Sequence, residues 1–188
     1  MKEVVKLMDY RPDIKIVDAT LRDGGLVNNF RFTDEFVKDL YQTNIKAGVD
    51  VMEFGYKADK EMFDVKDFGK WKFCDDEDIR AVVGDNNTDL KIAVMADVGR
   101  CNYKQDIKPR AESPVDVIRV ATYINQIPAA VDVIEDAVAK GYEVTCNIMA
   151  ISNAQEADIR VALDLLGKSP VNVIYTVSYT HLTLPTNS

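Results

Sequence analysis

The chain has 188 residues, 47% hydrophobic and 29% charged, a composition typical of one globular domain with an apolar core. Its formal net charge of -8 argues against a nucleic-acid partner. Because it has neither a bilayer-length apolar run nor the apolar centre of a signal peptide, we expect a cytoplasmic protein with no membrane partner. The three cysteines form no C-x-x-C pair and are expected to be free thiols.

Short apolar runs alternate with helical patterns along the chain. Residues 14–17 indicate a first strand, which Gly24 and Gly25 should end in a loop. Thr33 is a suitable N-cap for a helix that reaches residue 47, where Gly48 stops it. Later strands are predicted at 49–54, 90–96, 115–122, 143–150 and 171–177. Later helices are predicted at 76–84, at 128–140, and from a capping-box pattern at Ser152 and Gln155 to residue 166, ending at Gly167.

This alternation predicts an α/β fold with a parallel sheet. The later units recur about every 27 residues, near the roughly 30 expected of a (β/α)8 barrel. The pattern alone is equally compatible with an open, doubly wound sheet. A closed barrel needs eight strands, so the barrel reading predicts an incomplete barrel with about six of its eight units.

Arg22 and Asp23 lie side by side where the first strand should end, within the stretch Asp-Ala-Thr-Leu-Arg-Asp-Gly-Gly at 18–25. Ligands of parallel α/β proteins bind at this edge of the sheet. A carboxylate there can hold a divalent cation, and a guanidinium can stabilise an oxyanion. The alternative is an Asp that caps a turn and pairs with its neighbouring Arg.

Polar residues flanked by apolar ones should face the interior of a barrel, because the outer face packs on helices. For Asp18 and Thr20 a supporting role is favoured. For the others, a functional role and a satisfied structural network are equally plausible. The residues that this rule selects are Asp18, Thr20, Glu53, Arg119, Asn147 and, more weakly, Tyr175.

The motif at 18–24 resembles the first-strand signature of the metal-dependent aldolase, lyase and synthase family, which includes 4-hydroxy-2-oxovalerate aldolase, HMG-CoA lyase and isopropylmalate synthase. The segments Arg-Val-Ala-Thr at 119–122 and Cys-Asn-Ile-Met-Ala at 146–150 resemble its aldolase branch. The resemblance covers residues 14–177. It implies that residues 1–177 are a partial TIM-barrel catalytic domain.

By this resemblance, Asp23 matches a ligand of a divalent metal, Mn²⁺ or Mg²⁺ first and Co²⁺ or Zn²⁺ as alternatives. Arg22 matches the arginine that stabilises an enolate. Glu53, which was selected by strand alternation and not by the resemblance, is predicted to be a further catalytic residue. The implied reaction is C–C cleavage or formation on a small α-keto acid, and the full-length parent could be a homodimer. Alternatives are an acetyl-CoA-dependent condensing synthase and a non-catalytic binding barrel. The predicted substrate-binding residues are Asn28, Asn29, Arg119, Asn147 and Tyr175.

The chain departs from the family pattern in two places. No His follows the Arg-Asp-Gly triplet; Asn28 and Asn29 stand there, as substrate contacts or as turn residues. The single histidine, His181, cannot complete a His-x-His pair, so the metal site should be incomplete in this chain. The segment 55–75, rich in Lys and aromatic residues, is predicted to be either a lid that attracts an anionic substrate or a solvated insertion with its own small apolar cluster.

Residues 178–188 do not continue the strand and helix pattern and resemble translated sequencing-adapter DNA. We expect them to be a non-native tail; the alternative is a genuine short C-terminus. If the tail is non-native, the chain is an inactive fragment whose exposed sheet edges favour aggregation.

Overall fold

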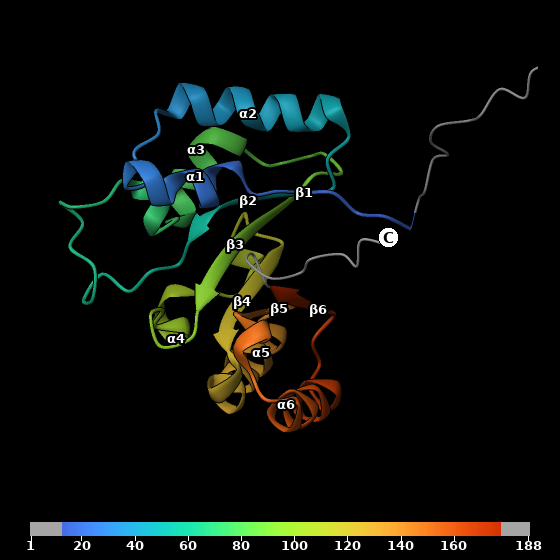
Figure 1. The fold of residues 1–188 in the computed structure, drawn as a ribbon. Coiled ribbons are helices and arrows are strands. Elements are labelled where there is room, and N and C mark those ends of the chain that lie inside the picture. Colours follow the sequence, from blue (N-terminus) through green and yellow to red (C-terminus); the bar gives the residue numbers. More distant parts are fainter. Residues whose placement is uncertain (1–12, 178–188) are drawn as a thin grey trace, which may run out of the picture.

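Six parallel strands form a single sheet in the part of the chain that the structure describes (Figure 1). The structure is a computed structural model, and it describes residues 13–177. The expected tail at 178–188, with His181, lies outside the described residues. The strands are β1 (Val17–Asp18), β2 (Val51–Tyr56), β3 (Lys91–Asp97), β4 (Val117–Tyr123), β5 (Glu143–Met149) and β6 (Val173–Val177).

Helices follow most of the strands and cover the sheet (Figure 1). Helix α5 packs against β4 and β5 and contacts α6, while α2 contacts α3. None of the helices in residues 13–177 is long and apolar enough to cross a membrane. The α-helices are α1 (Thr20–Asn28), α2 (Asp34–Ala47), α3 (Asp76–Val83), α4 (Tyr103–Asp106), α5 (Ile127–Ala139) and α6 (Glu156–Lys168). Short 3-10 turns are η1 (Lys70–Lys72), η2 (Arg110–Glu112), η3 (Ile124–Gln126) and η4 (Ile151–Asn153).

The strand order is β1-β2-β3-β4-β5-β6, the same as the order along the chain. A doubly wound sheet would reverse its order at a switch point, whereas a barrel adds each strand beside the previous one. The order therefore confirms an incomplete (β/α)8 barrel with six strands. The carboxyl ends of all six strands lie at one edge, where the candidate site is found.

The predicted bounds of the first strand were wrong, and so was the loop predicted after it. Strand β1 is Val17–Asp18, and the residues expected to form a loop instead form helix α1. Gly25 explains this difference, because a Cβ at that position would lie 2.1 Å from a ring carbon of Phe30. The glycine thus lets α1 pack on Phe30, and the helix ends at Asn29, whose φ of 55° is left-handed.

Helix α2 was predicted correctly, and α6 was predicted as a helix but with the wrong start and end. The Thr33 hydroxyl accepts a hydrogen bond from the Phe36 N–H at 3.2 Å, and Gly48 closes α2 with a φ of 71°. The expected capping box at Ser152 is absent, because Ala150 is left-handed and places Ser152 in η4. Helix α6 starts after Gln155 and continues through Gly167.

The core includes part of the segment 55–75 that follows β2. Trp71 is fully buried, and a Cβ at Gly55 would lie 1.9 Å from the Trp71 carbonyl oxygen. The segment is therefore anchored by its own core residue and is not a wholly solvated insertion. Cys74, Cys101 and Cys146 are unpaired, which confirms the expected free thiols.

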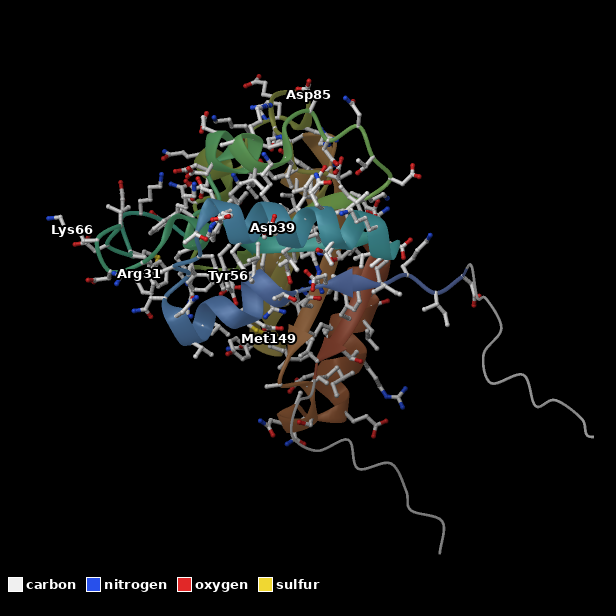
Figure 2. The ribbon with its side chains drawn as sticks, turned by 90° about the horizontal axis from the view of Figure 1, so that it is seen from above. Arg31, Asp39, Tyr56, Lys66, Asp85 and Met149 are labelled. Atoms are coloured by element: carbon white, nitrogen blue, oxygen red, sulfur yellow. The ribbon has the colours of Figure 1, made fainter. Side chains whose placement is uncertain are left out.

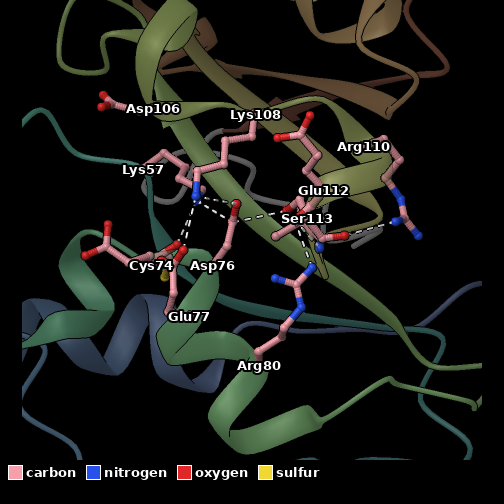
Figure 3. A network of polar contacts seen from close by, with 12 residues as sticks. Lys57, Cys74, Asp76, Glu77, Arg80, Asp106, Lys108, Arg110, Glu112 and Ser113 are labelled. Atoms are coloured by element: carbon pink, nitrogen blue, oxygen red, sulfur yellow. Dashed lines mark hydrogen bonds and ion pairs between the residues drawn. The ribbon is translucent and has the colours of Figure 1, made fainter.

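A buried ion pair fixes the same segment to the outer layer (Figure 3). Lys57 Nζ donates to the Cys74 carbonyl at 2.8 Å and to Asp76 Oδ1 at 2.9 Å. The Ser113 hydroxyl donates to the same Asp76 oxygen at 3.1 Å. These contacts join the end of β2, the start of α3 and the chain before β4.

Candidate active site

A cavity of about 400 Å³ opens at the carboxyl ends of the strands, on the inner face of the sheet. Its lining mixes cationic, acidic and apolar side chains, as expected of a site for a small polar ligand. Figure 2 labels two of its residues, Tyr56 and Met149. The polar and aromatic lining residues are Arg22, Tyr56, Asp97, Arg119, Asn147 and Tyr175; Met95, Ala121 and Met149 are among the apolar ones.

Glu53 joins two arginines at the floor of this cavity. Its Oε2 accepts hydrogen bonds from Arg22 Nε at 2.9 Å and from Arg119 Nη1 at 2.7 Å. Arg22 comes from α1, Glu53 from β2 and Arg119 from β4, so three separate elements build the cluster. We call these three residues the Arg-Glu-Arg cluster.

The charges of the Arg-Glu-Arg cluster are strongly coupled. Glu53 is completely buried, and burial raises its pKa while the charges of Arg119 and Arg22 oppose that shift. Burial alone would lower the pKa of Arg22, but the Glu53 carboxylate outweighs it and the pKa is raised. The Arg22 guanidinium therefore stays charged, with the Glu53 side chain between it and Arg119.

Asn147 and Tyr175 extend the cluster along the sheet. Arg119 Nη2 donates to Asn147 Oδ1 at 3.4 Å, and its guanidinium carbon lies 5.1 Å from the centre of the Tyr175 ring. Asn147 and Tyr175 are paired in register on β5 and β6. The structure thus brings together Arg22, Glu53, Arg119, Asn147 and Tyr175.

Two buried nitrogen atoms of this group have no hydrogen-bond partner within residues 13–177. They are Arg119 Nε and Asn147 Nδ2. Leaving a buried donor unpaired is costly, so such groups are ready to bind a ligand that supplies oxygen atoms. This supports substrate contact for Arg119 and Asn147 beyond their structural role.

Asp23 lies at the rim, next to the cavity and not among the residues that line it. Arg22 Nη1 donates to its carboxylate, and the Asp23 side chain is 54% exposed. No group of three His, Cys, Asp or Glu residues that could hold a metal ion exists within residues 13–177. The described residues therefore do not fit a metal ion by themselves, and Asp23 as a metal ligand stays a prediction.

Asn28 and Asn29 are not brought to the cavity. The Asn28 side chain donates to the Arg31 carbonyl at 3.2 Å, and the Asn29 carbonyl accepts from the Gly69 N–H at 2.7 Å. Arg31 in turn donates to the carbonyl oxygen of Lys66 at 3.0 Å (Figure 2). These contacts favour the turn-residue alternative, with both asparagines linking the end of α1 to the segment 55–75.

Asp18 and Thr20 have the supporting role that was favoured for them. Asp18 Oδ1 accepts from the Thr20 hydroxyl at 2.5 Å, and Asp18 Oδ2 accepts from Asn44 Nδ2 at 2.9 Å. Asp18 therefore joins β1, the start of α1 and the end of α2. It holds α1, and with it Arg22, in place.

Sequence reasoning missed Tyr56 and Asp97. Burial raises the pKa of Tyr56 to about 12 and also raises the pKa of Asp97. The signal for Asp97 was present, because Ala96 and Val98 flank it. The predicted strand stopped one residue too early, at 96, so the rule for inward-facing polar residues was not applied there.

No family model matches the chain, but two curated proteins are similar to it in sequence. The 4-hydroxy-2-oxovalerate aldolase 6 of Rhodococcus jostii is 28% identical over 145 residues, which are 77% of this chain and 40% of that protein. The 4-hydroxy-2-oxovalerate aldolase of Pelotomaculum thermopropionicum is 25% identical over 175 residues, or 93% and 50% of the two chains. The chain thus spans at most half the length of these curated relatives.

Solved structures show the same fold. The N-terminal domain of a candidate aldolase from Bacteroides vulgatus matches 87% of this chain and 62% of its own, with a TM-score of 0.56 and 21% identity. The HMG-CoA lyase from Brucella melitensis matches 87% of this chain over 60% of its own chain, with a TM-score of 0.55 and 14% identity. The chain is thus similar in sequence, at low identity, to 4-hydroxy-2-oxovalerate aldolases, and it is similar in fold to a candidate aldolase and an HMG-CoA lyase.

Proposed function

We propose that the full protein is an aldolase-like C–C lyase that cleaves a small 4-hydroxy-2-oxo acid, or forms it in reverse, through an enolate. The observation that carries this proposal is the Arg-Glu-Arg cluster at the cavity floor. The names of the two sequence relatives supply the substrate class.

Arg22 is suited to hold the enolate oxygen. Glu53 fixes its Nε and Asp23 accepts from its Nη1, so the guanidinium is oriented before a substrate arrives. A donor that needs no reorganisation stabilises a developing oxyanion more than a mobile one. Its buried position strengthens this effect, because the Arg22 side chain is only 11% exposed.

Arg119 is suited to bind the carboxylate of the keto acid. It lines the same cavity, and its neighbour Asn147 offers an amide nitrogen without a partner. Guanidinium–carboxylate contacts are directional and strong, so they would fix the reacting carbon atoms relative to Arg22. Tyr175 packs on the Arg119 guanidinium and limits its movement.

Metal dependence and the role of Asp23 as a ligand are part of the same proposal for the full protein. A divalent ion, when bound, would polarise the keto group. The residues described here contribute one rim carboxylate to such a site, and the roles given to Arg22 and Arg119 do not depend on the ion.

The experiment is a cleavage assay with 4-hydroxy-2-oxovalerate, which follows keto-acid release with and without Mg²⁺ or Mn²⁺. Arg22→Lys keeps the charge and loses the directed donors, so kcat should fall about 10²–10³-fold. Arg160→Lys, on the exposed face of α6, is the matched control and should leave kcat unchanged. Turnover of the Arg22→Lys variant at the wild-type rate would contradict the assignment.

A non-catalytic binding barrel is the second candidate. The absence of a three-ligand group within residues 13–177 favours it. A wild-type protein that binds keto acids but releases no product with any of the metals would support this candidate over the lyase.

A further inference from the structure

Asp97 is an acidic group in the cavity for which the structure shows no supporting role. It is the last residue of β3 and the register partner of Ala121 on β4, and both residues line the cavity with Arg22 and Arg119. Its Oδ1 is buried and has no hydrogen-bond partner within the described residues. A buried carboxylate oxygen without a partner is unfavourable for folding and is typical of a group kept for a ligand.

The surroundings of Asp97 act on its pKa in opposite directions. Burial raises its pKa, and the charges of Lys72, Arg100 and Arg22 oppose that shift. The ionisable groups that act on it come from η1, the turn after β3, α1 and β2: Lys72, Arg100, Cys101, Arg22 and Tyr56.

Lys72 is the first of the opposing charges and is itself held in a fixed place. Its ammonium lies 4.4–5.5 Å from the ring centres of Phe30, Tyr56, Phe63 and Phe68. Burial lowers its pKa. The aromatic rings therefore keep a cation close to Asp97 without a hydrogen bond or ion pair that would occupy the carboxylate.

We propose that Asp97 is the proton-transfer residue of this site. The inference rests on the proposed function. In cleavage, the Asp97 carboxylate takes the proton of the C4 hydroxyl, the C3–C4 bond breaks, and C4 leaves as an aldehyde. The electron pair of that bond forms the enolate, whose oxygen Arg22 stabilises, and Asp97 then returns the proton to C3 to give the keto acid. Atoms and electrons balance without a further reactant.

This assignment fills the gap that the sequence showed. Residues 13–177 contain no histidine, so proton transfer in this cavity falls to another side chain. Asp97 reaches this cavity from the end of β3. General acid–base catalysis by one positioned group contributes about 10²–10⁴-fold in rate, and burial, which raises the pKa of Asp97, makes its carboxylate a stronger base.

The first test is Asp97→Asn in the cleavage assay over pH 5–9. We expect kcat to fall about 10²–10³-fold and the rise of kcat with pH to disappear. Asp106→Asn is the matched control, because burial also raises the pKa of Asp106 and this residue does not line the cavity. An Asp97→Asn variant within threefold of the wild type, with the same pH profile, would overturn the inference while the lyase function stands.

The second test needs no turnover. Oxalate, a dianion shaped like a keto-acid enolate, is titrated into the protein by calorimetry at pH 5 and pH 8. At pH 8 the Asp97 carboxylate should repel the dianion, so Asp97→Asn should bind about tenfold tighter than the wild type, and this difference should shrink at lower pH as Asp97 takes up a proton. If cleavage is absent but this pattern holds, the lyase proposal fails and Asp97 is still placed at the ligand. Equal affinities at pH 8, or no binding by either protein, would overturn the placement.

Discussion

Replacing Glu53 by Gln should destabilise the fold more than its small change in shape suggests. The substitution keeps the side-chain volume and one carbonyl oxygen, and removes the only charge that separates Arg22 from Arg119. Two guanidiniums, with side chains 11% and 10% exposed, would then face each other with no carboxylate between them, and Arg22 would keep only its pair with Asp23 at the rim.

The magnitude follows from burial. Removing one partner of a buried ion pair typically costs about 3–5 kcal/mol, because the remaining charge is left uncompensated. Glu53 is 0% exposed and serves two arginines at 2.7 and 2.9 Å, so the upper half of that range is expected. A loss of about 4 kcal/mol would be a large fraction of the stability of a typical domain.

Urea unfolding at pH 7, followed by circular dichroism at low protein concentration, measures this loss. Glu156→Gln is the matched control: the same substitution at an exposed pair with Arg160 on α6, where about 0.5 kcal/mol or less is expected. If Glu53→Gln unfolded within about 1 kcal/mol of the wild type, Glu53 would be protonated in the native state and the ion-pair reasoning would be refuted.

Other consequences of the structure can be checked in the same way. Lys57→Met should cost about 3–5 kcal/mol in urea unfolding, because it removes the closer cation from the buried Asp76 carboxylate and leaves only Lys108, at 3.9 Å; an unchanged midpoint would contradict this. Gly55→Ala should lower the thermal midpoint, since its Cβ would lie 1.9 Å from the Trp71 carbonyl oxygen. At Gly167 an added Cβ would have no atom within 4 Å, so Gly167→Ala should raise stability by up to about 1 kcal/mol. A Gly55→Ala variant more stable than Gly167→Ala would contradict the packing described here. Burial raises the pKa of Cys101 and Cys146 to about 12 and raises that of Cys74, so at pH 8 the reactive thiolate is scarce. All three should react with a disulfide reagent at once in urea and slowly in the native protein, and equal rates would contradict the burial.

The order of the strands and helices was predictable, because the periodic spacing of apolar residues and the residues that end helices are signals within a short stretch of sequence. Thr33 and Gly48 mark α2 by their own capping chemistry, and the buried strands read as apolar runs. The start of the chain was not predictable in the same way. A glycine pair normally signals a loop, but Gly25 sits inside α1 because the ring of Phe30 needs its space, which is a tertiary effect.

The candidate site likewise has a part that local sequence predicts and a part that depends on tertiary contacts. Inward-facing polar residues on β2, β4 and β5 could be selected by strand alternation, and the structure gathers Glu53, Arg119 and Asn147. The bonds between Arg22, Glu53 and Arg119 could not be predicted, because they join α1 to strands far along the chain. Asp97 was missed because the predicted strand ended at residue 96, one residue before the end of β3.

Hydrogen–deuterium exchange of the pyruvate methyl group examines the enolate itself, apart from cleavage. Pyruvate is incubated with the protein in D₂O, with and without Mg²⁺, and loss of the methyl signal is followed by proton NMR. We predict exchange with the wild type and at least a hundredfold slower exchange with Arg22→Met. Exchange by the wild type no faster than in buffer, with either ion condition, would contradict an enolate-stabilising site.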